Sequence, residues 1–263
     1  MTTTSRDIGQ RVSPCLEWLF AEPEAIEDRV AAAAKQHLRQ VEFWYWRRRD
    51  VDHLAKALHD NGVGVSAVVV DPQANIADRT THDPWLANVR DSAEVAAHLH
   101  SPILVATAGQ RVEAASEDEQ LRAVTDAFTA AAAIAADHNV TLALEPLNDR
   151  VDHRGTLLTS SFAALDLVEE VGSPALGILL DVYHSHAMGE DVPAVIRRLG
   201  PHIAHIQVAD DPGRHEPGTG TVPWAAVLTA LDDVGYQGSI GLEYKPTMPS
   251  ADSVTFSLRA LRD

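Results

Sequence analysis

Four side chains able to bind a cation stand at the downstream ends of apolar, strand-like runs in the second half of the chain. A strand buried on both faces reads as continuous Val, Ile, Leu and Ala, and a carboxylate at its end costs desolvation free energy unless a cation receives it. Four such residues in successive strands indicate one shared positive partner, most simply a divalent metal ion. They are Glu145 in VTLALEP, Asp181 in LGILLDVYH, Gln207 in IAHIQVAD and Glu243 in GSIGLEYKP. The alternative is that each acid only caps the next helix or forms a local salt bridge.

Three carboxylates and one amide oxygen form a hard donor set, which suits Mn²⁺ or Mg²⁺, with Co²⁺ tolerated, better than a zinc site of thiolates or imidazoles. A metal chelated by a hydroxyl and a neighbouring carbonyl oxygen acidifies the carbon-bound proton and stabilises the enediolate. Glu145 and Glu243 could then serve as base and acid. Isomerisation, epimerisation and, if a β-hydroxyl leaves, dehydration all start from this chemistry, and the sequence leaves the three outcomes open.

The rest of the chain alternates between apolar runs and helix-length segments, which predicts a closed parallel (β/α)8 TIM barrel spanning residues 1–263 as one domain. In such a barrel the downstream strand ends converge on one rim, so the four side chains should meet there. The expected strands are 12–19, 40–45, 64–70, 103–108, 140–145, 176–183, 203–209 and 239–244. The expected helices are 23–38, 51–61, 84–98, 116–139, 160–171, 192–199, 224–234 and 250–261.

An open doubly wound sheet is the alternative fold, but no glycine-rich phosphate loop follows the first strand, so no nucleotide cofactor is expected. The net charge of −17 argues against nucleic acid and anionic membranes as partners. A single cysteine, Cys15, fits a reducing compartment. The first residues lack the apolar segment of a signal peptide and no run of about 18 apolar residues occurs, so a cytoplasmic enzyme is expected. Association into a homo-oligomer stays open.

Several residues near the strand ends are candidates for substrate contact. His184 follows Asp181 by three residues and could hydrogen-bond a substrate oxygen, with His186 a weaker candidate. The loop DDPGRHEPGTG offers Arg214, His215 and Glu216 on a turn shaped by Pro and Gly, where a cation could hold a carboxylate or polyol.

The aromatic and basic run EFWYWRRRD follows the expected second strand. Trp46 lies near the rim and could form an apolar wall of the pocket. The arginines 47–49 are interpreted as a solvated approach to a helix rather than a nucleic-acid site. Glu42, on the strand itself, could support the ligand cluster or form a buried salt bridge.

The segments LALEPLN, GILLDVYHSH, HIQVADDPGRHEPGTG and IGLEYKP resemble the hydroxypyruvate isomerase branch of the xylose isomerase-like barrel superfamily, which also holds ketose 3-epimerases. The similarity continues more weakly in VEFWYW and VATAG. The resemblance implies a sugar or keto-acid isomerase or epimerase, an intramolecular oxidoreductase or a racemase, with one divalent ion. It assigns metal binding to Glu145, Asp181, Gln207 and Glu243, proton transfer to the two glutamates, and substrate contact to His184 and Arg214.

Two loops depart from that branch, in VVVDPQANIADR and in DRVDHRGTLL, and Thr221 stands where an acid commonly follows GTG. The two loops should face substrate, so hydroxypyruvate, a longer ketose, a tetronate-type keto acid and another polyol derivative all stay open. His153 and Arg154 in the second loop are candidates for a specificity contact.

Overall fold

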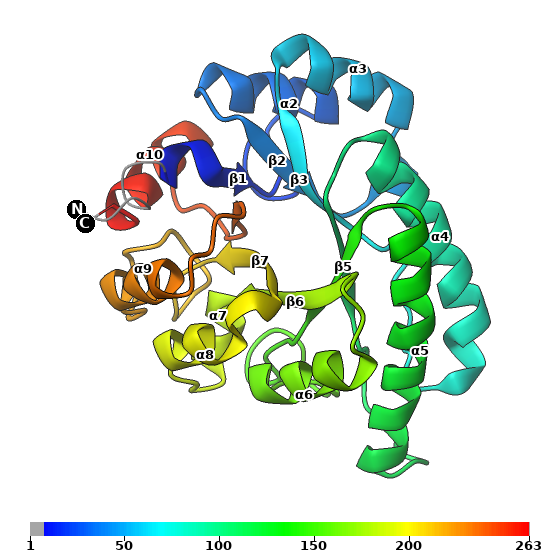
Figure 1. Ribbon diagram of the computed structural model, residues 1–263. Helices are drawn as coiled ribbons and strands as arrows, with labels where there is room; N and C mark the ends of the chain where they lie inside the picture. The colour runs from blue at the N-terminus through cyan, green and yellow to red at the C-terminus, as the bar shows by residue number, and fades with distance from the viewer. Residues whose placement is uncertain (1–7, 263) are drawn as a thin grey trace.

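The computed structural model describes residues 8–262, in which eight parallel strands form a nearly closed barrel with helices outside it (Figure 1). The sheet order is β1-β8-β7-β6-β5-β4-β3-β2, and every neighbouring pair in that order is parallel. Between β1 and β2 the barrel is completed by one bridge, Cys15 to Glu42, where the backbone N–H of Leu16 donates to the Glu42 carbonyl oxygen at 2.9 Å. The predicted (β/α)8 barrel is confirmed.

Each expected strand is present, and all but the first lie within two residues of the predicted range; β1 ends at Pro14, five residues before its predicted end. The strands are β1 (Val12–Pro14), β2 (Gln40–Phe43), β3 (Gly64–Val69), β4 (Ile103–Thr107), β5 (Thr141–Glu145), β6 (Leu176–Asp181), β7 (Ile203–Val208) and β8 (Ile240–Leu242). The helices are α2 (Ile26–Lys35), α3 (Val51–Asn61), α4 (His82–His98), α5 (Glu117–Asp137), α6 (Ser161–Val171), α7 (Val182–Ala187), α8 (Val192–Leu199), α9 (Trp224–Asp233) and α10 (Ser250–Ala260). The short helix α7 is an addition to the elements expected from the sequence.

Local sequence explains where several helices begin and end. Ser116 and Glu119 form a reciprocal capping box at the start of α5, and Asp50 accepts a hydrogen bond from the backbone of His53 at the start of α3. Helix α3 ends at Gly62, whose φ of 62° lies in the left-handed region that glycine adopts at little cost. These signals account for the start of α5 and for both ends of α3.

Two groups of apolar side chains fill the protein. The larger lies between the strands and the outer helices and includes Trp85 of α4, whose ring packs edge-on against Phe128 of α5 at 5.7 Å. The smaller lies inside the barrel and consists of Ala67, Ile103, Val105, Ala143 and Leu179. Because side chains alternate along a strand, residues 145 and 181 face the same interior as residues 143 and 179. The interior therefore changes from apolar to acidic at the downstream strand ends.

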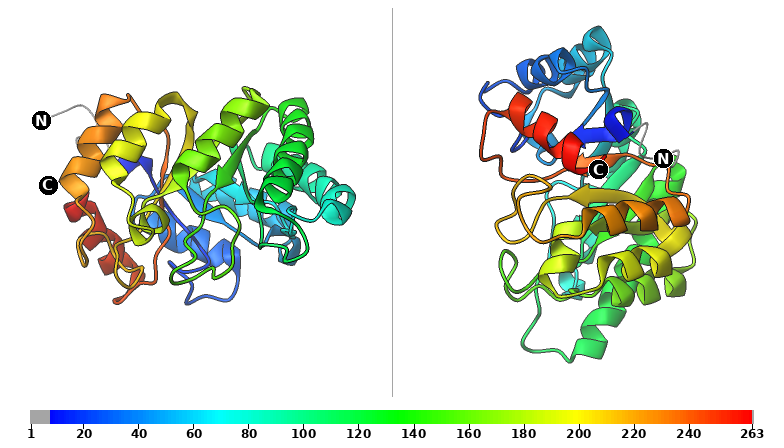
Figure 2. Two further views of the ribbon diagram at one scale, coloured as in Figure 1. Left: turned by 90° about the horizontal axis from the view of Figure 1, so that it is seen from below. Right: turned by 90° about the vertical axis from the view of Figure 1, so that its left-hand side faces the viewer.

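The helices surround the strands in both further views (Figure 2), and the Ala-rich α5 packs one face into the larger core as expected. No helix within residues 8–262 combines the length and hydropathy that a membrane span requires.

Candidate active site

The structure brings the four predicted ligand residues to one rim of the barrel. Glu145 ends β5, Asp181 ends β6, Gln207 lies one residue before the end of β7, and Glu243 follows β8 directly. Asp181 and Gln207 are aligned partners in the β6–β7 register, and Gln207 is aligned with Gly241 in the next pair. The convergence expected from the strand pattern is therefore present.

Short contacts join these side chains into one cluster. The Gln207 amide nitrogen donates to Glu243 Oε1 at 3.2 Å, and Arg214 Nη2 lies 2.5 Å from Glu243 Oε2 and 3.3 Å from Asp181 Oδ2. One carboxylate oxygen of Glu145 and one of Asp181 lie within 4.8 Å of each other, and a ring nitrogen of His184 lies within the same distance of both. Asp181 also accepts a hydrogen bond from the backbone of Tyr183 at 2.8 Å, so it caps α7 while it faces the cluster.

The cluster holds three carboxyl groups, and the positive charge of Arg214 does not balance them. Burial raises the pKa of Glu243 to about 8, although the nearby Arg214 acts in the opposite direction. Burial, followed by the charges of Glu243 and Asp181, raises the pKa of Glu145 well above its ordinary value. Burial likewise raises the pKa of Asp181, against the effect of Arg214. A second positive charge at this place would be favourable because it would lower all three pKa values together.

The donor set fits a divalent cation of the Mn²⁺ or Mg²⁺ type. Gln207 is buried, and its amide oxygen has no hydrogen-bond partner among residues 8–262, although buried amide oxygens are normally paired. Oxygen donors without thiolates are what hard cations prefer. The residues present therefore fit such an ion, while its binding and identity stay predictions.

His184 lies in α7, not in a loop, and only 2% of its surface is exposed. Its Nδ1 is 2.6 Å from the amide nitrogen of Asn148, whose oxygen accepts from the backbone N–H groups of Val151 and Asp152. Asn148 must therefore donate to Nδ1, which places the hydrogen of a neutral imidazole on Nε2. Burial, and then Arg214, lower the pKa of His184 well below its ordinary value, which keeps the ring neutral.

Nε2 of His184 faces Glu145 Oε1 at 3.7 Å and Asp181 Oδ2 at 3.5 Å, and it has no hydrogen-bond partner among the described residues. Both distances are long for a hydrogen bond. An N–H held there is suited to a substrate oxygen and unsuited to a metal, which would need the nitrogen lone pair. The substrate role of His184 stays a prediction, since its Nε2 is buried in this structure.

A pocket with a volume of about 330 Å³ opens onto the cluster. Besides Glu145, Gln207, Glu243, His184 and Arg214, its lining includes Trp44, Tyr45, Gln73, Thr107, Gln110, Leu147, His153 and Thr156. His153, a predicted specificity residue, packs its ring edge-on against His184 at 5.2 Å. Both loops that depart from the family pattern contribute lining residues, Gln73 from the first and His153 from the second.

Arg214 is held firmly beside the acids. Its guanidinium lies over the rings of Trp18 and Tyr183 at 4.8 and 5.1 Å, and its backbone oxygen accepts from the N–H of Lys245 at 2.8 Å. Its φ is 57°, a left-handed value that a side chain such as arginine adopts at a cost. That conformation aims the predicted substrate-binding cation at the ligand cluster.

Two predicted contact residues are not in the pocket. Trp46 lies in a short 3₁₀ helix (Trp46–Arg48) and donates its ring N–H to Ser92 at 3.0 Å, so its prediction as a pocket wall was wrong. Glu216 is fully buried, and its carboxylate accepts from the backbone and side chain of Thr247 and from Ser253 at 2.8 to 3.0 Å. It therefore anchors the loop that carries Arg214 and does not face substrate.

Three other candidates also stand apart from the cluster. His186 pairs with Asp211 at 2.9 Å, and His215 Nδ1 contacts the backbone oxygen of Lys245 at 2.8 Å. Arg154 is exposed and does not line the pocket.

Sequence reasoning missed Trp44 and Asn148. The ring N–H of Trp44 donates to Glu243 Oε1 at 2.9 Å, which places an aromatic wall directly against a predicted proton-transfer group. Asn148 sets the His184 tautomer because its amide nitrogen donates to Nδ1. The available signal for Trp44 was its even spacing from Glu42, because side chains two apart on a strand share a face.

Comparisons with known proteins agree with this architecture. Residues 30–263 match the family model described as the xylose isomerase-like TIM barrel. A Streptomyces coelicolor relative provisionally assigned as a hydroxypyruvate isomerase is 34% identical over 94% of this chain and 95% of its own. A 2-oxo-tetronate isomerase from Cupriavidus necator is 30% identical over 84% of this chain and 88% of its own.

Among solved structures, that of an AP endonuclease, family 2, from Brucella melitensis has a TM-score of 0.87 and 25% identity, covering 94% of this chain and 97% of the other. The similarity to hydroxypyruvate isomerases expected from the strand-end motifs is thus confirmed, and relatives in the same family are isomerases of small keto compounds. The chain belongs to the xylose isomerase-like TIM-barrel family.

Proposed function

We propose that this protein is a divalent-metal-dependent isomerase or epimerase of a small hydroxy-carbonyl compound, such as hydroxypyruvate, another keto acid or a ketose. The observation that carries the proposal is the meeting of Glu145, Asp181, Gln207 and Glu243 in one buried cluster at the ends of β5 to β8. The names of the isomerase relatives support the reaction class.

The same four residues would hold the ion, with Mn²⁺ or Mg²⁺ the best fit and Co²⁺ tolerated. When bound, a divalent cation polarises the substrate carbonyl and lowers the free energy of the enediolate. The support for this assignment is the hard donor set, the unpaired amide oxygen of Gln207, and the raised pKa values of the three acids.

In this proposal Glu145 and Glu243 exchange protons with a substrate held between them. Two strands, β6 and β7, separate β5 from β8 in the barrel order, so the two carboxylates approach the cluster from different sides. Burial raises the pKa of Glu243 to about 8 in the absence of an ion, and a bound cation would lower it, which would leave the carboxylate able to accept a substrate proton. The ring N–H of Trp44 and the guanidinium of Arg214 hold Glu243 in place.

The rest of the pocket supports a small polar substrate. Its volume of about 330 Å³ suits a molecule of a few carbons, and its outer lining offers the neutral polar groups of Gln73, Thr107 and Gln110. The Nε2–H of His184 and the guanidinium of Arg214 would contact substrate oxygens near the reacting carbons, and His153 borders the same space.

Two other functions compete with this one. A dehydratase would use the same enediolate but lose a β-hydroxyl. The second alternative is an abasic-site nuclease, because one similar structure is that of an AP endonuclease. The net charge of −17 opposes nuclease activity, as does a pocket in which Arg214 is the only Arg or Lys among the described lining residues, because phosphate binding needs clustered cations. We therefore propose a small-molecule substrate and no nucleic-acid partner.

The proposal is tested by stripping the protein with EDTA, adding back Mn²⁺, Mg²⁺ or Co²⁺, and following hydroxypyruvate, 2-oxo-tetronate and ketoses by NMR in D₂O. Metal-dependent interconversion of one substrate class, with deuterium at the carbon that exchanges its proton, is the expected result. Loss of water from the substrate would indicate the dehydratase instead. Full activity after stripping, or cleavage of an abasic-site duplex with no turnover of any carbonyl substrate, would reject the proposed function.

A further inference from the structure

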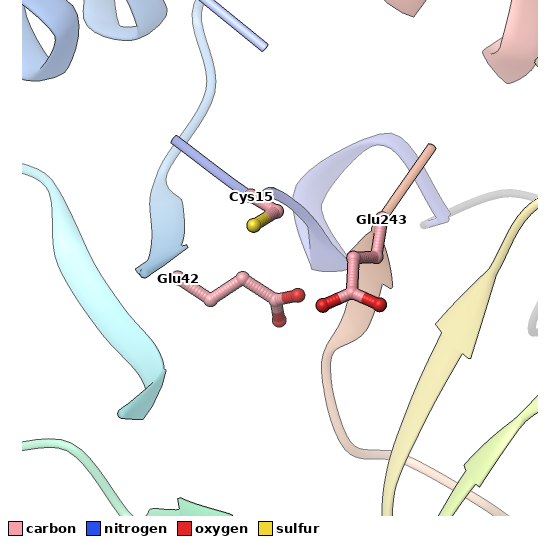
Figure 3. A group of neighbouring side chains, drawn as sticks. All are labelled: Cys15, Glu42 and Glu243. Atoms are coloured by element: carbon pink, nitrogen blue, oxygen red, sulfur yellow. The ribbon is translucent and has the colours of Figure 1, made fainter. Parts of the chain in front are cut away.

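A buried polar group lies beneath the cluster, inside the barrel, and centres on Glu42 of β2. Glu42 is 2% exposed, and its carboxylate faces that of Glu243, with Cys15 close to both (Figure 3). His205 Nε2 lies 2.8 Å from Glu42 Oε2, and the Ser66 hydroxyl donates to the same oxygen at 3.4 Å. The other oxygen, Oε1, accepts from the amide nitrogen of Gln207 at 2.8 Å. Glu42 is therefore tied both to the barrel wall and to a predicted metal ligand.

The hydrogen bonds of Gln207 use its amide nitrogen and not its oxygen. An amide group has two N–H donors and one oxygen. Both donors point at carboxylates, one at Glu42 Oε1 (2.8 Å) and one at Glu243 Oε1 (3.2 Å). The oxygen is left buried without a partner among residues 8–262, in a residue that lines the pocket.

The opposite orientation of this amide would be unfavourable. Rotating it by half a turn would place its oxygen against two carboxylates at about hydrogen-bond distance and would leave its N–H groups without acceptors. A buried polar group without a partner costs about 1–3 kcal/mol before any repulsion is added. The pair of carboxylates thus selects one of two orientations that the amide shape alone cannot distinguish.

We propose that Glu42 is a positioning residue that orients the Gln207 amide so that its oxygen, not its NH₂ group, is presented as a ligand to the divalent cation. The inference rests on the proposed function and extends it to a residue that does not touch substrate. Glu42 is suited to this role better than Glu243, because Glu243 is itself a predicted ligand and proton carrier. Glu42 is not among the residues that line the pocket, and its Oε2 is held by His205 and Ser66.

The neighbouring strand leaves room for this arrangement. A Cβ atom added to Gly241 of β8 would lie 2.5 Å from Glu42 Oε2 and 2.8 Å from Gln207 Cγ. Contacts this close between such atoms require one of them to shift. Glycine at this position therefore permits the Glu42 and Gln207 side chains to meet in the barrel interior.

The test measures Mn²⁺ affinity by calorimetry and by the EPR signal of free Mn²⁺, with turnover not required. Glu42→Met keeps the side-chain length but removes both acceptors, and Mn²⁺ should bind about 10- to 100-fold more weakly, the usual effect of removing a group that orients a ligand. Glu42→Gln keeps one acceptor oxygen for Gln207 and should bind within about threefold of the wild type. Ser66→Ala is the matched control: it removes the weaker contact to Glu42 Oε2, leaves Gln207 untouched, and should not change the affinity.

A double-mutant cycle separates orientation from a general effect of charge. If Glu42 acts through Gln207, adding Glu42→Met to Gln207→Ala should weaken binding no further, because the oriented oxygen is already gone. Additive losses, equal losses in Glu42→Met and Glu42→Gln, or unchanged affinity in folded Glu42→Met would each overturn the inference while leaving the proposed function intact. Absence of Mn²⁺ binding by the wild type would overturn both. Circular dichroism checks folding, and Glu42→Ala replaces Glu42→Met in the cycle if the latter does not fold.

Discussion

Replacing Glu243 with Gln should remove one of the contributions to the pH dependence of stability in the metal-free protein, beside those of Glu145 and Asp181. Burial holds the pKa of Glu243 at about 8 in the folded chain, against an ordinary value of 4.5. Near neutral pH the folded carboxyl is therefore largely protonated, and a glutamine amide closely resembles it in shape and charge. The NH₂ group of the new amide cannot accept the hydrogen bonds that Glu243 accepts from Trp44, Gln207 and Arg214, so the variant should also lose stability at every pH, and the informative quantity is how the difference from wild type changes with pH.

The sign follows from proton binding in the two states. A group whose pKa is raised by folding contributes stability that is fully present below about pH 4.5 and is lost as the pH rises through about 8. Between these values the folded protein retains a proton that the unfolded chain has released. One such group lowers the free energy of unfolding by about 1.4 kcal/mol per pH unit. The Glu243→Gln variant has no such proton to release, so its stability should fall less steeply by about that amount.

The measurement is urea unfolding in EDTA at several values between about pH 5 and pH 9. The difference in unfolding free energy between Glu243→Gln and wild type should grow with pH and level off above about pH 8. Glu190→Gln is a matched control, because Glu190 accepts hydrogen bonds from Ser161 and Ser185 and lies outside the pocket lining. Parallel stability curves for wild type and Glu243→Gln would refute the reasoning that burial sets the protonation of Glu243.

Four further outcomes are expected. Mn²⁺ at about 100 times its dissociation constant should raise the free energy of unfolding by about 2.7 kcal/mol. Binding should be tighter at higher pH because the ligands must be deprotonated. A melting temperature independent of Mn²⁺ would contradict this. Glu243→Gln should lower kcat by about 10²- to 10⁴-fold while a substrate analogue still binds, and unchanged turnover would exclude proton transfer by Glu243. Trp44→Phe removes the ring N–H that Glu243 accepts and should change kcat and its pH profile, whereas Trp46→Phe, which loses a contact outside the pocket, should leave both unchanged. Glu216→Ala removes the acceptor of the buried Ser253 hydroxyl and of the backbone N–H of Thr247, and should cost about 1–3 kcal/mol in urea unfolding. An unchanged midpoint would show that Glu216 does not anchor its loop.

The barrel and its acidic rim could be predicted because both depend on short-range patterns. Runs of β-branched and aliphatic residues mark most of the strands, and Glu145 and Asp181 are the last residues of theirs. A parallel barrel then brings distant strand ends together whatever the loops do. The prediction needs no knowledge of which side chains touch.

The aromatic run after β2 shows where such reasoning fails. The sequence pattern predicts a strand that continues to residue 45, but the strand ends at Phe43, and a 3₁₀ helix starts at Trp46. The early turn directs Trp46 toward Ser92, while Trp44 reaches Glu243. Turn geometry of this kind depends on tertiary packing, and a shift of two residues exchanges the pocket wall for an outer contact.

The prediction that Glu216 contacts substrate failed for a different reason. A carboxylate on a loop of Pro and Gly beside Arg214 has the local character of a substrate contact. Its partners, Thr247 and Ser253, lie about thirty residues later, after β8 and in α10. Local sequence does not carry such pairings, so a buried structural acid and a catalytic one look alike until the fold brings their partners into place.

Local sequence also does not determine how the side chain of the predicted ligand Gln207 is oriented. Residue type is enough to predict that Gln207 offers an oxygen, but an amide offers an NH₂ group equally well, and its choice depends on what lies behind it. That group is Glu42, which is 165 residues earlier in the chain and is separated from β7 by the two strands β8 and β1 in the barrel order. A carboxylate pointing into a barrel interior needs a structural reason, since burial is costly. Strand alternation in the sequence already predicts that Glu42 points into the barrel. In our proposal the structural reason for this inward carboxylate is that it orients the amide of Gln207.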